Sequence, residues 1–178
     1  GDELSGAKIS QGDNYIFLGS HRGQAIRFRE EDVRAMGRQA RGVRAMSLAH
    51  DDYLVGMEVV EKEGLLLSIA ENGYGKRTQL ETYRLTSRGG KGVINMKTTN
   101  KTGRVVDVLL VKEDSDLMIV SQNGKMIRIE SSTIRQAGRS TQGVRLVNLE
   151  EGDKVAAASV LAEAEEAPAD ETETLPLQ

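Results

Sequence analysis

Arginine recurs at three fixed places along this chain, and cations at a regular spacing are suited to bind a regular row of anionic groups. The members of each set lie 50 or 51 residues apart. The three sets are Arg27, Arg77 and Arg128; Arg34, Arg84 and Arg135; and Arg38, Arg88 and Arg139. Guanidinium groups form strong, charge-assisted hydrogen bonds with phosphate oxygens. Repeated core residues need only folding as an explanation, whereas repeated arginines predict a charged surface with a regular pitch.

Glycine follows the same period and provides the frame for the arginines. One set of glycines precedes a valine in each unit, and a turn glycine lies 19 residues before each member of that set. The valine-linked set is Gly42, Gly92 and Gly143, and the turn set is Gly23, Gly73 and Gly124. A fixed period of this size is typical of a repeat architecture. We therefore expect three copies of one structural unit.

Each unit contains two short apolar or alternating runs joined by a tight turn. In the second unit these are Leu65–Ile69, a turn at Asn72–Gly73, and Lys76–Leu80. Asn-Gly between such runs favours a β-hairpin, because both central residues of a type I′ turn need positive φ. A third strand is expected at residues 43–48, 93–97 and 144–149, and a fourth at 54–60, 104–111 and 154–161. Four strands in about 50 residues is the size of a propeller blade.

We therefore predict an all-β fold, a β-propeller-like array of four-stranded blades with about three repeats of 50 residues. The expected parts are the last strand of a missing preceding blade at 1–12, blades at 13–62, 63–112 and 113–161, and a disordered acidic tail at 162–178. The first part follows from the alignment of Glu3–Gly6 with Tyr53–Gly56, which indicates a piece of a longer array. The sequence leaves open whether three blades close, self-associate or form an open arc.

Charge is distributed unevenly along the chain. Residues 161–178 hold six acids and no lysine or arginine, whereas residues 76–104 hold eight bases and one acid. Two interpretations of the tail stand: it competes with an anionic ligand for the basic surface, or it only aids solubility. Cysteine is absent, which excludes disulfides and thiolate metal sites. No apolar run approaches the ~20 residues that span a bilayer, so no membrane partner is expected.

No arrangement of residues predicts catalysis in this segment. The two histidines, His21 and His50, lie 29 residues apart in polar turns. No nucleophile is paired with a base, and no two acids form the pair that general acid–base chemistry needs. We therefore predict no catalytic residue, no metal site and no cofactor in this segment.

The connection between the second and third strands of the middle unit carries a resemblance to a known family. It reads Thr86-Ser-Arg-Gly-Gly-Lys-Gly92. The C-terminal DNA-wrapping domain of the DNA gyrase A subunit has a box of the form Gln-basic-Arg-Gly-Gly-basic-Gly, and the last five positions match. The phrases Val33–Gly37, Asn72–Thr78 and Thr141–Arg145 are also similar to later blades of that domain. The resemblance covers residues 1 to about 160. The first two positions of the box differ. In that family the full box belongs to the first blade, so the resemblance implies that residues 86–92 are a repeat-equivalent copy in a later blade.

The resemblance implies the final three blades of a β-pinwheel that binds duplex DNA without sequence preference and bends or wraps it. Such a domain supports ATP-dependent negative supercoiling by a type IIA topoisomerase, an isomerase whose catalytic site lies outside this segment. The implied partners are double-stranded DNA and, within an A2B2 assembly, the remainder of the gyrase A subunit and the gyrase B subunit. The implied location is the bacterial cytoplasm, at the nucleoid.

Basic residues in and beside these connections are the candidate DNA contacts. They are Arg38, Arg41, Lys76, Arg77, Arg84, Arg88, Lys91, Arg135 and Arg139. Lysine and arginine bind phosphates with release of condensed counterions, and neighbouring glycines let the backbone approach closely. Arg27, Arg77 and Arg128 lie in strands, where shielding of a sheet face is an equal alternative. For the whole chain, the alternative function is a propeller-like protein-interaction module that binds an acidic partner.

Overall fold

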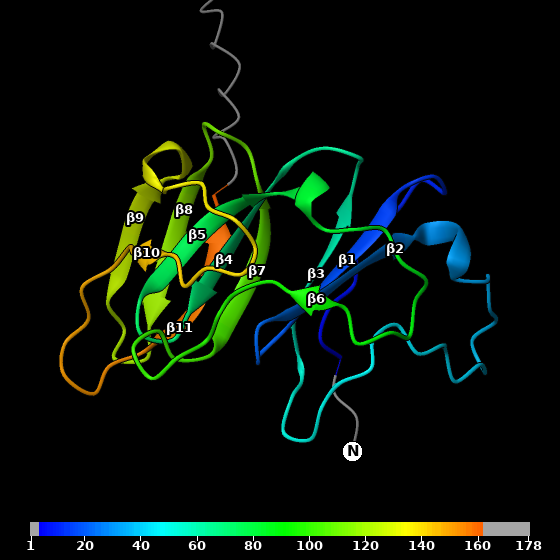
Figure 1. Ribbon diagram of the computed structural model, residues 1–178, viewed down its shortest axis with the longest axis horizontal. Helices are drawn as coiled ribbons and strands as arrows, with labels where there is room; N and C mark the ends of the chain where they lie inside the picture. Colours follow the sequence, from blue (N-terminus) through cyan, green and yellow to red (C-terminus); the bar gives the residue numbers. More distant parts are fainter. Residues whose placement is uncertain (1–3, 162–178) are drawn as a thin grey trace, which may run out of the picture.

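The computed structural model describes residues 4–161, and its regular elements are β-strands and three single helical turns (Figure 1). The strands are β1 (Tyr15–Ser20), β2 (Gln24–Arg29), β3 (Leu54–Val60), β4 (Leu65–Ala70), β5 (Tyr74–Gln79), β6 (Val93–Ile94), β7 (Val105–Val111), β8 (Asp116–Ser121), β9 (Met126–Glu130), β10 (Val144–Arg145) and β11 (Val155–Val160). The 3-10 turns are η1 (Glu30–Asp32), η2 (Leu80–Thr82) and η3 (Ser131–Thr133). The all-β prediction is confirmed. The predicted tail at 162–178 lies outside the described residues.

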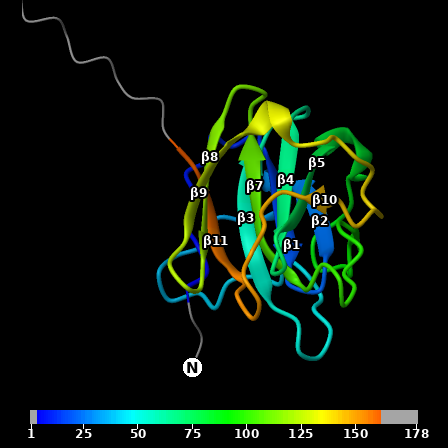
Figure 2. The same ribbon diagram turned by 90° about the vertical axis from the view of Figure 1, so that its left-hand side faces the viewer.

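Three antiparallel sheets contain these strands, in the orders β3-β1-β2-β6, β10-β5-β4-β7 and β11-β8-β9. The predicted hairpins are present as β1–β2, β4–β5 and β8–β9. In each unit the fourth strand returns to lie beside the first strand of its own hairpin. The strand direction turns from one sheet to the next in Figure 1, whereas in the side view of Figure 2 the strands project onto a similar direction.

The third strand of a unit pairs with the hairpin of the preceding unit. Val93 of β6 is opposite Ala25 of β2, and Val144 of β10 is opposite Gly75 of β5. Figure 1 shows this exchange: the green segment leaves the left-hand sheet, reaches β2 as β6, and returns to form β7. The expectation that one contiguous unit forms one blade is therefore corrected. The sequence period predicts that each unit has a third strand. It does not predict which hairpin that strand pairs with, because the hairpins of all units have the same sequence pattern.

Two predicted strands are absent from the described chain, for one common reason. Residues 43–48 and 4–12 form no strand. In the later units the equivalent segments form strands because each pairs with a hairpin. For residues 43–48 and 4–12 that hairpin would belong to a unit before the first, which residues 4–161 do not contain. Similarly, the third sheet has three strands because no later described unit supplies an edge strand to β9. The boundaries 13–62, 63–112 and 113–161 thus divide the sequence repeat, while each complete sheet also draws a strand from the next unit.

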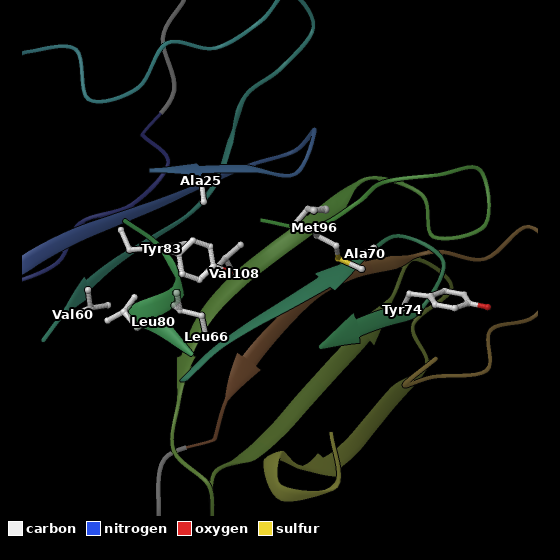
Figure 3. Close-up of a cluster of buried hydrophobic side chains, with 11 residues drawn as sticks. Ala25, Val60, Leu66, Ala70, Tyr74, Leu80, Tyr83, Met96 and Val108 are labelled. Carbon is white, nitrogen blue, oxygen red and sulfur yellow. The ribbon is translucent and has the colours of Figure 1, made fainter. Parts of the chain in front are cut away.

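Hydrophobic cores lie between successive sheets. The first core joins the first and second sheets, and Figure 3 shows side chains reaching it from both. Ala25 and Val60 come from the first sheet, and Leu66, Ala70 and Val108 from the second. A second core joins the second and third sheets in the same way. Each sheet therefore depends on its neighbour to remove its apolar face from water.

Glycine makes the strand exchange sterically possible. Gly92 has φ +75°, and a β-carbon there would lie 2.1 Å from the carbonyl oxygen of Ala25. Gly143 has φ +73°, and a β-carbon there would lie 2.4 Å from the carbonyl oxygen of Gly75. Gly42 has φ +82° but no atom within 4 Å of the same point. The glycine period thus marks where a chain segment lies directly against the preceding hairpin.

Two of the strand arginines also fasten neighbouring units together. Arg27 is 6% exposed, and its guanidinium donates to the carbonyl oxygens of Lys62, at 2.9 Å, and Leu80, at 3.2 Å. Arg77 is 3% exposed and donates to the carbonyl oxygen of Ile134 at 2.8 Å. Leu80 and Ile134 each belong to the unit that follows the arginine, whereas Lys62 is the last residue of the unit of Arg27 itself. Buried guanidinium groups need such partners, because an unpaired buried charge is costly.

Arg128 occupies the equivalent place in the third unit and behaves differently. Its side chain is 66% exposed and pairs with Asp116 of the same hairpin. The described chain holds no later unit whose carbonyl oxygens it could reach. The sequence left two roles open for this set, DNA contact and shielding of a sheet face, and neither describes the two buried members.

We expect Gly92→Ala to destabilise the fold far more than Gly42→Ala. Both changes place a side chain in the left-handed region, at about 1–2 kcal/mol. Only Gly92→Ala also forces a β-carbon into a backbone oxygen, so overpacking adds about 1–3 kcal/mol. Urea unfolding followed by circular dichroism measures both losses. Equal losses in the two variants would contradict this account of the glycine period.

We also expect Arg77→Met to cost about 1–3 kcal/mol of unfolding free energy, because it leaves carbonyl oxygens of the third unit without a donor. The matched change, Arg128→Met, removes an exposed ion pair and should cost below about 1 kcal/mol. The same urea titration compares them. A loss in Arg128→Met as large as that in Arg77→Met would argue against the fastening role.

Candidate nucleic-acid interface

The two basic connections at residues 86–92 and 138–143, here called the junction loops, lie where one unit meets the preceding one. In the first junction loop, the amide of Gly89 donates to the carbonyl oxygen of Ala45 at 2.6 Å, and Gly90 accepts from the amide of Ser47. In the second, Thr141 accepts from the amide of Lys97 at 3.0 Å. Strand exchange thus carries basic segments of successive units to equivalent places.

Arg88 and Arg139 connect these loops to the preceding unit. Arg88 donates from Nη1 to the carbonyl oxygen of Arg44 at 3.0 Å and from Nε to that of Asp32 at 2.9 Å. Arg139 donates from Nη1 to the carbonyl oxygen of Ile94 at 3.0 Å. Both side chains are half-buried. A guanidinium has five N–H donors, so each keeps donors free for an external oxygen while it holds its loop in place.

The remaining candidates from the connections are exposed to solvent. They are Arg38, Arg41, Arg84, Lys91 and Arg135. Within residues 4–161, none of these five side chains forms an ion pair or donates a hydrogen bond. Arg84 and Arg135 occupy the same place on successive units, which is the arrangement that the arginine period predicts. These side chains can release counterions to a phosphate backbone without breaking a contact within the described fold.

Lys76 and Arg77 do not share that surface, and the prediction that they face solvent is wrong. Lys76 is 0% exposed and Arg77 is 3% exposed. Both lie in β5, where only Gln79 is exposed because the third unit covers the strand. Most of their acceptors lie at residues 132–141, and Arg77 also pairs with Glu113 at 2.6 Å. All of these groups belong to the third unit, so the local sequence holds no sign of the burial of Lys76 and Arg77.

Burial sets the protonation behaviour of Lys76. Removal from water lowers its pKa to about 8, and the positive charge of Arg139 acts in the same direction. Its ammonium donates to the carbonyl oxygen of Gly138 at 2.6 Å and to Thr141 Oγ1 at 3.3 Å. It also donates to the carbonyl oxygen of Arg139. The group therefore acts inside the protein, beneath the second junction loop.

A second group of cations surrounds Tyr74 and was not among the candidates. Arg145 donates to the Tyr74 hydroxyl at 3.1 Å, and its guanidinium lies 5.2 Å from the ring centre. Lys101 lies 5.5 Å from the same ring centre. The hydrogen bond and the charge of Arg145 lower the pKa of Tyr74. Arg145 follows Gly143 at the distance at which Arg44 follows Gly42, but Ile94 interrupts the set in the middle unit, which hid it from a search for threefold repetition.

No set of three or more histidine, aspartate or glutamate side chains in residues 4–161 could hold a metal ion. No helix among these residues is long and apolar enough to cross a membrane.

Comparisons with known proteins agree with the threefold repeat. The family model described as "DNA gyrase C-terminal domain, beta-propeller" matches residues 14–61, 65–112 and 115–162. The A subunit of DNA gyrase from Helicobacter pylori is 46% identical over 158 residues, which is 87% of this chain and 19% of that protein. The same protein from Aminobacterium colombiense is 40% identical, over 90% of this chain and 20% of that protein. The chain thus spans about a fifth of the length of these curated relatives.

Solved structures share the fold. The structure of a DNA gyrase A C-terminal domain superposes with a TM-score of 0.78 and 30% identity, covering 84% of this chain and 51% of that chain. The C-terminal domain of DNA topoisomerase IV gives a TM-score of 0.79 at 23% identity, covering 84% and 47%. The second likeness concerns the fold alone. With three matches to the family model along its length, the chain belongs to the DNA gyrase C-terminal domain family of β-propellers.

Proposed function

We propose that this chain binds duplex DNA along its phosphate backbone, without sequence preference, and bends or wraps it. The observation that carries the proposal is the recurrence of exposed cations at equivalent places on successive units, as at Arg84 and Arg135. Backbone phosphates of a duplex are also regularly spaced. Each phosphate that a cation neutralises releases condensed counterions, which provides sequence-independent affinity.

The proposed contacts are the candidates that the fold leaves at the surface or the junctions. They are Arg38, Arg41, Arg84, Arg88, Lys91, Arg135 and Arg139. Bending a site of 20–30 base pairs by 40–90° costs on the order of 1–6 kcal/mol, so several such contacts must act together. The chain has two phenylalanines, four tyrosines and no tryptophan, which disfavours stacking on single strands.

In the cell, we infer, this segment works within the A subunit of DNA gyrase, together with gyrase B subunits in an A2B2 assembly. Curated relatives that carry the name of the gyrase A protein support this inference, since they match along most of this chain. There the segment would guide DNA over a type IIA topoisomerase and support ATP-dependent negative supercoiling. The corresponding location is the bacterial cytoplasm, at the nucleoid.

We expect the double change Arg84→Ala with Lys91→Ala to weaken binding to every duplex alike. Neither side chain donates a hydrogen bond within the described residues, so their removal should leave the fold intact. The slope of log K against log salt should become shallower by about 0.9 for each lost phosphate contact. Filter binding at several salt concentrations, with two duplexes of unrelated sequence, measures this slope.

Lys8→Ala is the matched control. It removes one positive charge where the double variant removes two, and Lys8 pairs with Glu58 of β3, at the opposite edge of the first sheet from β6. Its slope should stay at the wild-type value. A slope unchanged in the double variant, or a loss confined to one of the two duplexes, would count against backbone binding and favour a protein partner with an acidic surface.

A further inference from the structure

The buried lysine of the middle unit replaces an isoleucine of the other two. Lys76 corresponds to Ile26 in the first unit and Ile127 in the third. Ile26 is buried in an apolar cluster with Leu18 and Phe28. The fold therefore accepts an apolar side chain at this place, and the ammonium group of Lys76 needs an explanation beyond folding.

The contacts of Lys76 point to the second junction loop. An ammonium has three donors. Here they have three acceptors in that one loop: the carbonyl oxygens of Gly138 and Arg139, and Thr141 Oγ1. Thr78 of the same strand adds a bond from Oγ1 to the carbonyl oxygen of Ala137 at 3.0 Å. The loop backbone is thus fixed from below by β5.

The first junction loop offers an internal comparison. It lies over Ile26, whose Cδ1 would be 3.8 Å from a β-carbon at Gly90. The amide of Thr86 also donates to the carbonyl oxygen of Arg27 in β2 at 3.0 Å. Within residues 4–161, however, no charged side chain of β2 donates to this loop. The two loops therefore carry equivalent arginines, Arg88 and Arg139, on different supports.

We propose that Lys76 is a positioning residue that fixes the backbone at Arg139 and thereby sets the DNA contact of the second junction loop. This inference rests on the proposed function. Lys76 itself, being buried, does not reach DNA. Its charged form provides the three donors, and Arg139 is the charged group that faces it from the loop. Tyr83, the other titratable group near this loop, has its pKa raised by burial and does not ionise in the same range.

The first test examines the loop without DNA. Lys76→Ile installs the residue of the two equivalent places. Lys76→Met serves as a second variant, because it keeps an unbranched chain and is shorter only by the ammonium group. Hydrogen exchange should become about tenfold faster at the amides of residues 137–143, and stay unchanged at residues 86–92. Equal protection of residues 137–143 in wild type and both variants would overturn the positioning role.

The second test needs no substitution. In an NMR titration of the wild-type chain, the Lys76 Cε resonance should shift with a midpoint near pH 8, the pKa that burial gives it. Amide resonances of residues 138–142 should shift with the same midpoint, because the ammonium is bonded to that backbone. Residues 86–92 should show no such midpoint. A Lys76 titration that the loop amides do not follow would overturn the proposal.

The closing experiment is a double-mutant cycle on the salt slope of duplex binding. Arg139→Ala should make the slope of log K against log salt shallower by about 0.9, and Lys76→Ile should make it shallower by part of that amount. Adding Lys76→Ile to Arg139→Ala should leave the slope of that variant unchanged. Adding Lys76→Ile to Arg88→Ala should make the slope of that variant shallower again. Full additivity with Arg139→Ala would overturn the link between the lysine and this contact.

The same cycle separates failure of this inference from failure of the proposed function. If Arg139→Ala and Arg88→Ala both leave the slope at its wild-type value, and the Arg84→Ala with Lys91→Ala variant does so too, the DNA function itself falls. If only the two junction arginines leave the slope unchanged, the DNA function stands on the exposed contacts and the link between Lys76 and DNA falls. If Arg139→Ala lowers the slope while Lys76→Ile leaves it unchanged, the DNA function stands and Lys76 only supports the fold.

Discussion

The pairing of each third strand with the hairpin of the preceding unit is the constraint on which the rest of the fold depends. It requires the chain to pass so close to a neighbouring carbonyl oxygen that glycine is needed, as at Gly92 against Ala25. Once made, the exchange brings successive sheets together face to face, with the apolar cores between them. It also carries the basic connections onto the boundary between units, so the surface charge and the cohesion of the array have one origin.

Arginine at repeated places performs distinct tasks according to how the exchange surrounds it. Arg77 reaches forward and donates to carbonyl oxygens of the following unit. Arg88 reaches backward and donates to carbonyl oxygens of the preceding one. Exposed residues such as Arg84 are then held on a scaffold fastened in both directions. A ligand that must be bent benefits from this, because contacts at fixed spacing need no ordering when it binds.

Local features of the chain were predictable, and features that depend on another unit were not. The hairpin of β4 and β5 could be predicted because alternation and an Asn-Gly turn are encoded within a dozen residues. The exposure of Arg84 and Arg135 followed from their places in polar connections. The partner of β6 could not be predicted, because the hairpin of its own unit and that of the preceding unit have the same sequence pattern. The burial of Lys76 was missed for the same reason, because its acceptors lie more than 60 residues further along.

The charge beneath the second junction loop has a consequence for binding. Burial lowers the pKa of Lys76, and repulsion from the like charge of Arg139 contributes to the same shift. A phosphate bound to Arg139 would offset that repulsion and raise the pKa of Lys76. The charged lysine is also the form that supplies all three donors to the loop. In the proposed complex, DNA contact at Arg139 and loop fixation by Lys76 would therefore favour one another. The first junction loop lies over the apolar side chain of Ile26 and has no equivalent coupling, although the sequence repeats the same arginine in both.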